Sequence, residues 1–229
     1  MWFINSPIKL TVDDISDLQH PTNHLAAALL KKFSLEAINF VIGESYNPDF
    51  RSPTVSQWAL NLNRTTKPSF DINTGGISLA YLLRFLDSKK TGSILYFVSN
   101  CLNLPEFLNA AAGVVLSDSE GRFKVESVQI QKINLSNPII PFVPCYGKAS
   151  VQINANALSL VRNFIFSKID ENLYDDIIIP DYFNPDRERA MLPPQVDVLH
   201  KIAQTSGRKI LVVELSSDNL VGFTELRSC

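Results

Sequence analysis

The residues best placed for chemistry surround a double glycine in FDINTGGISLAYLL, residues 70–83. An apolar and acidic lead-in, two glycines and a helical apolar pattern predict a strand, a sharp turn and a helix. In α/β enzymes such a turn presents a nucleophile at the helix start, but Gly75 and Gly76 have no side chain to react. The nearest hydroxyl is Ser78, which would point roughly 200° around the helix from position 76. Cys101 follows the next predicted strand and is the other weak nucleophile candidate, although we expect a buried, inert thiol.

The cysteines and histidines do not form a metal or disulfide pattern. The three cysteines, at positions 101, 145 and 229, are odd in number and widely spaced, with no close pair of the kind that zinc sites use. His20 and His24 lie four residues apart, but a proline lies between them and no carboxylate or cysteine cluster completes a ligand set. We therefore predict no metal and no cofactor.

Composition favours a folded chain with a sizeable core. The sequence has 229 residues, of which 45% are hydrophobic and 19% charged, with a formal charge of −2 and a pI near 5.9. The absence of a basic block argues against a nucleic-acid surface. The longest apolar runs are too short to span a bilayer, and MWFINSPIKL lacks the pattern of a secretory signal. We expect a cytoplasmic protein whose partners are small molecules or other proteins.

Helical and strand patterns alternate along the chain, which predicts an α/β architecture with a largely parallel sheet and helices outside it. Helical spacing covers residues 22–32, 55–62, 77–86, 150–168 and 196–205. Strand patterns cover residues 37–43, 68 to the double glycine, 93–100, 174–180 and 210–215, with a hairpin within 110–130. Residues 131–145, which are rich in proline, predict a joint between an N-terminal half, 1–130, and a C-terminal half, 146–229, of one compact unit.

Four segments in order resemble β-ketoacyl-acyl-carrier-protein synthase III and its relatives of the thiolase fold. NHLAAALLKKFSLEAINFVIGESYNPDF is similar to the family's first helix, strand and active-site loop, and FDINTGGISLAYLL to its nucleophile segment, where an Asp-x-Asn pair precedes the catalytic cysteine. LNAAAGVVLSDSEG is similar to its Gly-Asp-Gly-Ala strand, and the run from Tyr146 through YDDIIIPDYFNP to ILVVELSSDNLVG to its second half. The resemblance covers most of the chain and implies a shortened thiolase-like α/β fold of two related βαβ halves with layered sheets and helices.

The departures from the family pattern concern the catalytic residues that the resemblance implies. The family's nucleophilic cysteine falls on Gly76, and its histidine, which follows an Ile-Pro pair, falls on Asp181. Its asparagine is matched, at most, by Asn219 in SSDNLVG. An ionised aspartate only accepts hydrogen bonds and would repel the oxyanion that the histidine normally stabilises. We therefore expect no condensing activity from this chain alone.

The resemblance leads to a non-catalytic role as the main functional hypothesis. Thiolase-fold proteins form dimers, and the strand after the nucleophile helix, here residues 93–100, is expected to join the two subunits edge to edge. A chain without catalytic groups can supply this surface to an active ketosynthase homologue and shape its acyl pocket, as chain-length factors do in fatty-acid, polyketide-like or secondary-metabolite biosynthesis. A heterodimer with such a homologue, with an acyl carrier protein as a further candidate partner, is the expected assembly.

Two alternatives remain open from the sequence. One is an acyltransferase or thioester hydrolase that uses a non-cysteine apparatus in the same cavity, or a nucleophile at Ser78 or Cys101. The other is a homodimeric module that binds an acyl ligand. The family's coenzyme A contacts have no recognisable counterpart here, so no such cofactor is predicted.

Overall fold

The computed structural model describes residues 1–12, 19–45, 53–72, 76–86, 91–101, 108–134, 142–143, 150–151, 155–181, 192–216 and 219–229. Most of the predicted joint, residues 131–145, lies outside the described residues, and the division into two halves stays a prediction. Within the described part, no helix is both long and apolar enough to cross a membrane.

One ten-stranded sheet runs through the molecule in the order β10-β11-β12-β7-β1-β6-β5-β3-β4, and β2 also pairs with β6. Its strands are β1 (Phe3–Ile4), β2 (Ile8–Val12), β3 (Phe40–Glu44), β4 (Ser69–Asp71), β5 (Ile94–Asn100), β6 (Asn109–Ser117), β7 (Phe123–Lys132), β10 (Asp176–Ile178), β11 (Lys209–Leu215) and β12 (Leu220–Ser228). A separate pair is formed by β8 (Phe142–Val143) and β9 (Ser150–Val151).

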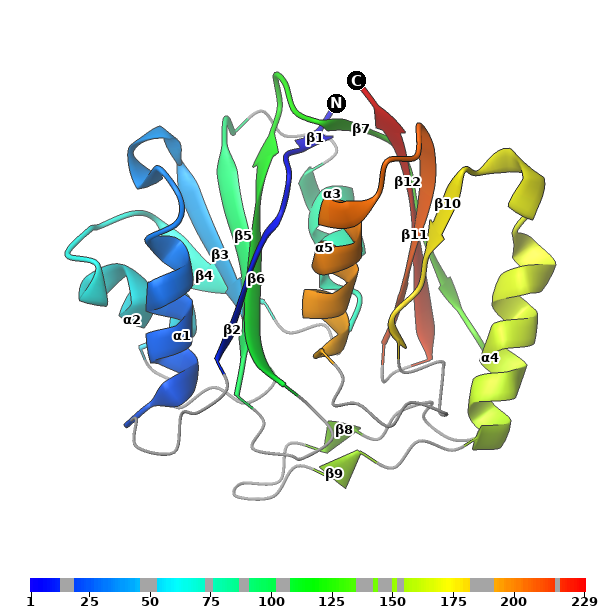
Figure 1. Ribbon diagram of the computed structural model, residues 1–229, viewed down its shortest axis with the longest axis horizontal. Coiled ribbons are helices and arrows are strands. Elements are labelled where there is room, and N and C mark those ends of the chain that lie inside the picture. Colours follow the sequence, from blue (N-terminus) through cyan, green and yellow to red (C-terminus); the bar gives the residue numbers. More distant parts are fainter. Residues whose placement is uncertain are drawn as a thin grey trace.

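The sheet forms two walls, with helices between the walls and on their outer faces. The helices are α1 (Pro21–Leu30), α2 (Val55–Leu62), α3 (Ser78–Leu86), α4 (Ala155–Lys168) and α5 (Pro194–Gln204), with single turns at Leu35–Ala37 and Glu171–Leu173. Figure 1 shows α3 and α5 between the wall of β2 to β6 and the wall of β7 and β10 to β12, with α1 and α2 outside one wall and α4 outside the other. Three apolar cores match this arrangement: a central one around α3 and α5, and one under each outer layer. The α/β prediction is thus confirmed as a layered fold.

The prediction of a largely parallel sheet with all helices outside it is wrong. Parallel pairing is confined to β3 with β4 and β5, and to β10 with β11, whereas the remaining strand pairs of the large sheet are antiparallel. A helix pattern between two strand patterns predicts a connection that can join parallel strands, but it does not say which strands become antiparallel neighbours. Two helices, α3 and α5, lie between the walls, and their buried apolar side chains share one core with residues of both walls.

The predicted hairpin within residues 110–130 has its two strands and its turn, but the strands do not pair with each other. Instead β1 lies between them, with Phe3 opposite both Ser117 of β6 and Lys124 of β7. The two-residue β1 therefore connects the two walls into one sheet.

Helix α2 begins and ends at the predicted residues, and its start is fixed by two caps at the N-terminus. Thr54 and Gln57 form a reciprocal capping box. Asp71, at the end of β4, accepts hydrogen bonds from the backbone N–H groups of Val55 and Ser56 at 2.7 and 3.1 Å. This carboxylate fixes α2 to the strand that leads into the double glycine.

Candidate functional site at the start of helix α3

Gly76 lies two residues before the first residue of α3, at the position where the sequence resemblance places a nucleophile. Its φ of 129° belongs to a region that side-chain-bearing residues rarely adopt. A β-carbon added there would overlap the carbonyl oxygen of Leu215 and lie 3.2 Å from Nε2 of Gln195. The space that glycine leaves is therefore filled by the chain's own β11 and α5, and no side chain fits at this position.

Glu214 occupies the hydrogen-bond donors at the start of α3. It lies on β11, is 1% exposed, and accepts from the backbone N–H groups of Leu79 at 3.2 Å and Ala80 at 2.8 Å. A carboxylate is favoured at this helix end because the first N–H groups have no partner within the helix and carry partial positive charge. The same donors, if free, could hold the oxyanion of a reacting thioester. Here they are already used.

A second buried carboxyl, Glu44 at the end of β3, lies on the other side of the helix start. Its Oε1 accepts from the Ser78 hydroxyl at 2.5 Å, and its Oε2 accepts from the Tyr96 hydroxyl at 2.6 Å. Glu44, Ser78 and Tyr96 are all fully buried. Glu44, on one wall, and Glu214, on the other, thus hold α3 from opposite sides.

The environment of this site favours the protonated forms of Glu44 and Glu214. Burial raises the pKa of Glu44 from 4.5 to about 7, although the hydrogen bonds from Ser78 and Tyr96 lower it, and nearby Asp71 raises it further. Burial likewise raises the pKa of Glu214 to about 8, against the two backbone hydrogen bonds and with a contribution from the charge of Glu44. Among the described residues, no lysine or arginine forms an ion pair with either carboxyl. The two groups therefore resist being ionised together near neutral pH.

Both nucleophile candidates are buried, but only one lies at this site. Ser78 is the first residue of α3 and donates its hydroxyl to Glu44, so a carboxyl that could serve as a base is in contact with it. Cys101 is 1% exposed and packs in the outer core with α1 and α2, whereas α3 belongs to the central core. The structure therefore does not bring Cys101 to the helix start.

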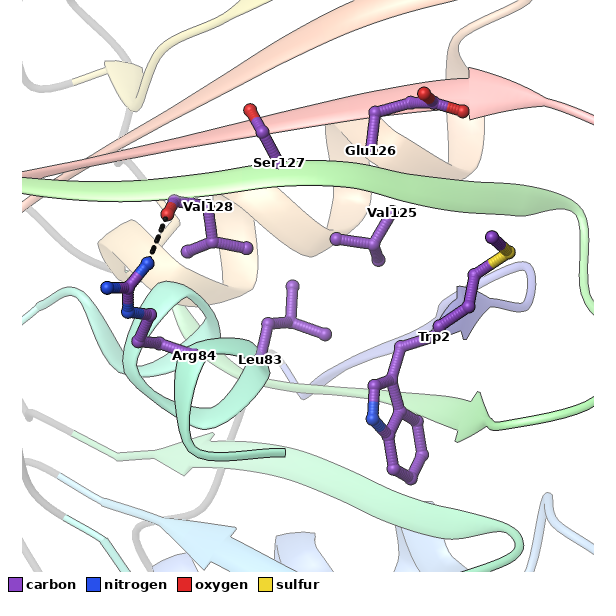
Figure 2. Close-up of a pocket in the computed structure, with 8 residues that line it drawn as sticks. Trp2, Leu83, Arg84, Val125, Glu126, Ser127 and Val128 are labelled. Atoms are coloured by element: carbon purple, nitrogen blue, oxygen red, sulfur yellow. Dashed lines mark hydrogen bonds between the residues drawn. The ribbon is translucent and has the colours of Figure 1, made fainter. Parts of the chain in front are cut away.

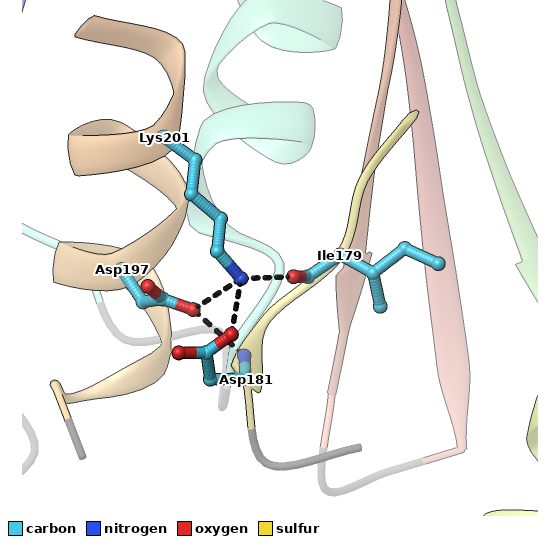
Figure 3. A network of polar contacts seen from close by, with 4 residues as sticks. All are labelled: Ile179, Asp181, Asp197 and Lys201. Carbon is cyan, nitrogen blue, oxygen red and sulfur yellow. Dashed lines mark hydrogen bonds and ion pairs between the residues drawn. The ribbon is translucent and has the colours of Figure 1, made fainter. Parts of the chain in front are cut away.

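Asp181, on which the sequence resemblance places the family's histidine, belongs to a compact polar network with Asp197 and Lys201 of α5 (Figure 3). Lys201 donates to Oδ1 of Asp181 at 2.7 Å and to the carbonyl oxygen of Ile179 at 2.6 Å, and it pairs with Oδ2 of Asp197 at 2.9 Å. The backbone N–H of Asp181 donates to the same Asp197 oxygen at 2.7 Å. Burial raises the pKa of Asp197, opposed by its contacts with Lys201. The network holds the chain after β10 against α5.

Asn219 lies in the turn between β11 and β12 in a left-handed conformation with φ of 62°. Its backbone N–H donates to Ser216 at 3.3 Å, and its carbonyl accepts from Ile133 at 2.8 Å. Asparagine tolerates this conformation better than most residues, which gives the residue a place in the turn. A catalytic role for it stays untested.

The histidine pair also lies away from the helix start. His20 precedes α1, with its ring edge-on to Trp58 at a centroid distance of 5.7 Å, and His24 is exposed on α1. In the described ranges, no three histidine, cysteine or acidic residues come together as metal ligands.

Sequence reasoning missed three residues of this site: Glu44, Glu214 and Gln195. The signal was present for the two glutamates, because each interrupts or ends an apolar strand pattern, FVIGE and ILVVEL, and a buried carboxyl is expected only where donors await it. Gln195 is 2% exposed, and both polar atoms of its amide lack a hydrogen-bond partner among the described residues. Nothing in its local sequence predicts this state.

Comparison by sequence gives no match to a family model and none to a curated protein. Comparison of structures gives several. The fold matches 3-oxoacyl-(acyl carrier protein) synthase III, FabH, from Pseudomonas aeruginosa PAO1 with a TM-score of 0.72 and 10% identity over 99% of this chain and 98% of that one. It matches the H285A variant of OleA from Xanthomonas campestris with a TM-score of 0.71 and 12% identity, over 93% and 83%.

A third match is AbyA1, a tetronic acid condensing enzyme, with a TM-score of 0.67 and 14% identity over 96% of this chain and 90% of that one. At these identities the likeness is one of fold. The layered arrangement around α3 and α5 is therefore the thiolase-like fold that these three proteins share.

Proposed function

We propose that this chain is a non-catalytic thiolase-fold subunit that pairs with an active ketosynthase homologue and helps shape its acyl pocket. The observation that carries the proposal is the start of α3. Position 76 has no room for a side chain because the Leu215 carbonyl lies there, and Glu214 occupies the N–H groups of Leu79 and Ala80. A condensing enzyme of this fold needs an attacking side chain at that position and free N–H donors for the oxyanion that forms.

The second catalytic position supports the same conclusion. Asp181 accepts from Lys201, and its backbone is bound by Asp197. Its carboxylate is thus committed to an ion pair with Lys201 within the chain. The chemistry that a histidine performs at this position would have to come from the partner's own site.

The pairing surface must be revised from the sequence-based expectation. Strand β5, residues 94–100, is fully buried and pairs with β3 on one side and β6 on the other, so it has no edge to offer. Strand β4 ends the sheet, and its far edge has no strand partner in the described part. Phe70 on β4 is 39% exposed and packs edge-on against Phe40 at 5.9 Å. An open edge with an exposed aromatic residue is suited to strand addition by a partner.

An acyltransferase or hydrolase remains the second candidate, and the 2.5 Å contact between Ser78 and Glu44 favours it. A serine with a carboxyl base is a recognised nucleophile arrangement. However, Ser78 is fully buried and the helix-start N–H groups next to it are occupied by Glu214. The geometry therefore supports the subunit role better. A homodimeric acyl-binding module is the third outcome that the experiment below distinguishes.

The test is co-expression with cysteine-bearing thiolase-fold proteins and, separately, an acyl carrier protein. Size-exclusion chromatography with light scattering gives the stoichiometry, and acyl-thioester turnover is assayed on each peak. We expect a one-to-one complex with a cysteine-bearing partner and no turnover by this chain alone. Phe70→Lys should reduce complex formation at least tenfold, whereas Leu173→Lys, at an exposed leucine away from β4, should not.

Turnover by the isolated chain, lost in Ser78→Ala, would overturn the subunit role in favour of the enzyme. A homodimer that co-purifies with an acyl compound and ignores every cysteine-bearing relative would support the binding module instead.

A further inference from the structure

A cavity of about 220 Å³ between α3 and β7 is lined by side chains that are engaged within the chain (Figure 2). Trp2 and Leu83 in its lining are only 3% and 2% exposed. The indole N–H of Trp2 donates to the carbonyl of Leu86 at 2.7 Å. At the rim, the guanidinium of Arg84 donates to the carbonyl of Val128 at 3.3 Å. A reactive pair of side chains lies instead between β2 and α5.

Lys9 of β2 and His200 of α5 are in direct contact. Nζ of Lys9 lies 3.2 Å from Nε2 of His200, although 191 positions separate them in the sequence. Side chains alternate along a strand, and the neighbours Ile8 and Leu10 pack against the outer core with α1 and α2. Lys9 therefore points to the other face of the wall, where α5 lies beside β2 (Figure 1). Within the described part of the chain, Lys9 forms no ion pair with a carboxylate.

The contact requires a neutral imidazole. A lysine ammonium has only donors, so Nε2 of His200 accepts and the ring proton lies on Nδ1. Burial lowers the pKa of His200 from 6.5, and the charge of Lys9 lowers it further. On α5 itself, Asp197 raises this pKa and Lys201 lowers it. Near neutral pH, Nε2 is therefore free to take up a proton.

We propose that Lys9 is an acylation site, at which its amine attacks acyl thioesters and His200 takes up the proton that is released. One N–H of the amine can stay bonded to Nε2 while the nitrogen lone pair attacks the thioester carbonyl. The new C–N bond leaves a positive charge on nitrogen, and transfer of its proton to His200 lets the C–S bond break. The departing thiolate takes this proton from the imidazolium, which yields an amide on Lys9, a free thiol and the original histidine.

The surroundings of the pair suit this reaction. Both side chains are half-buried, so a small thioester can reach the amine while the pair stays in contact. A thiolate leaves readily because a thiol has a pKa of only about 8.5. A positioned general base increases the rate of such a step by about 10²–10⁴. The site uses none of the residues at the start of α3, so it does not depend on the proposed subunit role.

The experiment treats the full chain with the small thioester S-acetyl-N-acetylcysteamine near neutral pH and follows each lysine by peptide mass spectrometry. Lys32 and Lys132, which are exposed, are references within the same molecule. Lys9 should be acetylated at least tenfold faster than either reference. His200→Gln keeps an acceptor for Lys9 but removes the base, so it should bring the rate at Lys9 to within about twofold of the references.

His24→Gln, at an exposed histidine on α1, is the matched control and should leave the rate at Lys9 unchanged. In the unaltered chain, the advantage of Lys9 over the references should shrink as the pH falls through the pKa of His200, because an imidazolium cannot accept a proton. Circular dichroism should show that each variant remains folded. The proposal is overturned if Lys9 reacts no faster than Lys32 and Lys132, or if His200→Gln leaves its advantage intact.

Discussion

Replacing Glu214 by glutamine should change how the stability of this chain depends on pH. Burial raises the pKa of Glu214 from 4.5 to about 8 and that of Glu44 to about 7, so both carboxyls hold protons in the folded state that the unfolded chain releases near pH 4.5. Stability gained from a raised pKa is fully present below the unfolded value and is lost as the pH rises through the folded one. The free energy of unfolding should therefore fall as the pH rises from about 5 to about 8.

The magnitude follows from the proton count. Each carboxyl contributes a slope of about 1.4 kcal/mol per pH unit while it is protonated in the folded chain and ionised in the unfolded one. For Glu214 alone, the free energy of unfolding should fall by on the order of 5 kcal/mol between the unfolded pKa of 4.5 and the folded pKa of about 8. Glu214→Gln should reduce the slope of the unfolding free energy against pH by the contribution of about one proton. It should also remove one of the two hydrogen bonds that the start of α3 donates to Glu214.

The assay is urea unfolding at half-unit steps from pH 5.5 to 8.5. The histidines are the same in both proteins, so their contribution cancels in the difference between the two slopes. Glu126→Gln is the control: Glu126 is exposed and hydrogen-bonded by Lys124, which lowers its pKa, so it stays ionised throughout the window. Equal slopes for the unaltered chain and Glu214→Gln would refute the assignment of a buried, protonated carboxyl at this position.

Three further substitutions test the site by equilibrium unfolding. Gly76→Ala should cost roughly 3–5 kcal/mol, from an unfavourable φ plus overlap with the Leu215 carbonyl. Gly113→Ala, whose β-carbon would lie 3.1 Å from the Phe33 ring and 3.3 Å from the β-carbon of Phe97, should cost less, about 1–2 kcal/mol, and equal costs would contradict the steric argument. Lys201→Met should cost about 2 kcal/mol, less than a fully buried pair because 28% of this side chain is exposed; an unchanged midpoint would mean that the two aspartates do not need it. Gln195→Met should stabilise the chain by about 1 kcal/mol, because it removes a buried amide that has no hydrogen-bond partner among the described residues; a large loss would reveal a partner for that amide.

The sequence was informative where structure depends on local pattern. Helix α2 was predicted at residues 55–62, where Thr54 and Asp71 cap it, and the strand cores of β5 and β11 were found from their apolar runs. Helix α3 was predicted at residues 77–86 and spans Ser78–Leu86. In each case the pattern that made the prediction lies within the element itself, although the Asp71 cap of α2 comes from 16 residues away.

The sequence was uninformative where contacts join distant residues. Glu214 meets the helix start of Ala80 across 134 positions, and Ser78 meets Glu44 across 34. Periodicity describes which face of an element is apolar but not which strand lies beside it. For the same reason β5 was mistaken for an edge strand, and the burial of α3 between two walls was missed.

Strand β1 can complete its place in the sheet only after β7 has been synthesised. It contains only Phe3 and Ile4, but it lies between β6 and β7, and its second neighbour includes Lys124. During synthesis at about 5–20 residues per second, the N-terminal residues would wait roughly 6–24 s for that strand to be made. Until then the wall of β2 to β6 has no neighbour beyond β1, so this edge stays open to other chains while the second wall is being made. A deletion as small as these two residues would extend that exposure to the finished protein.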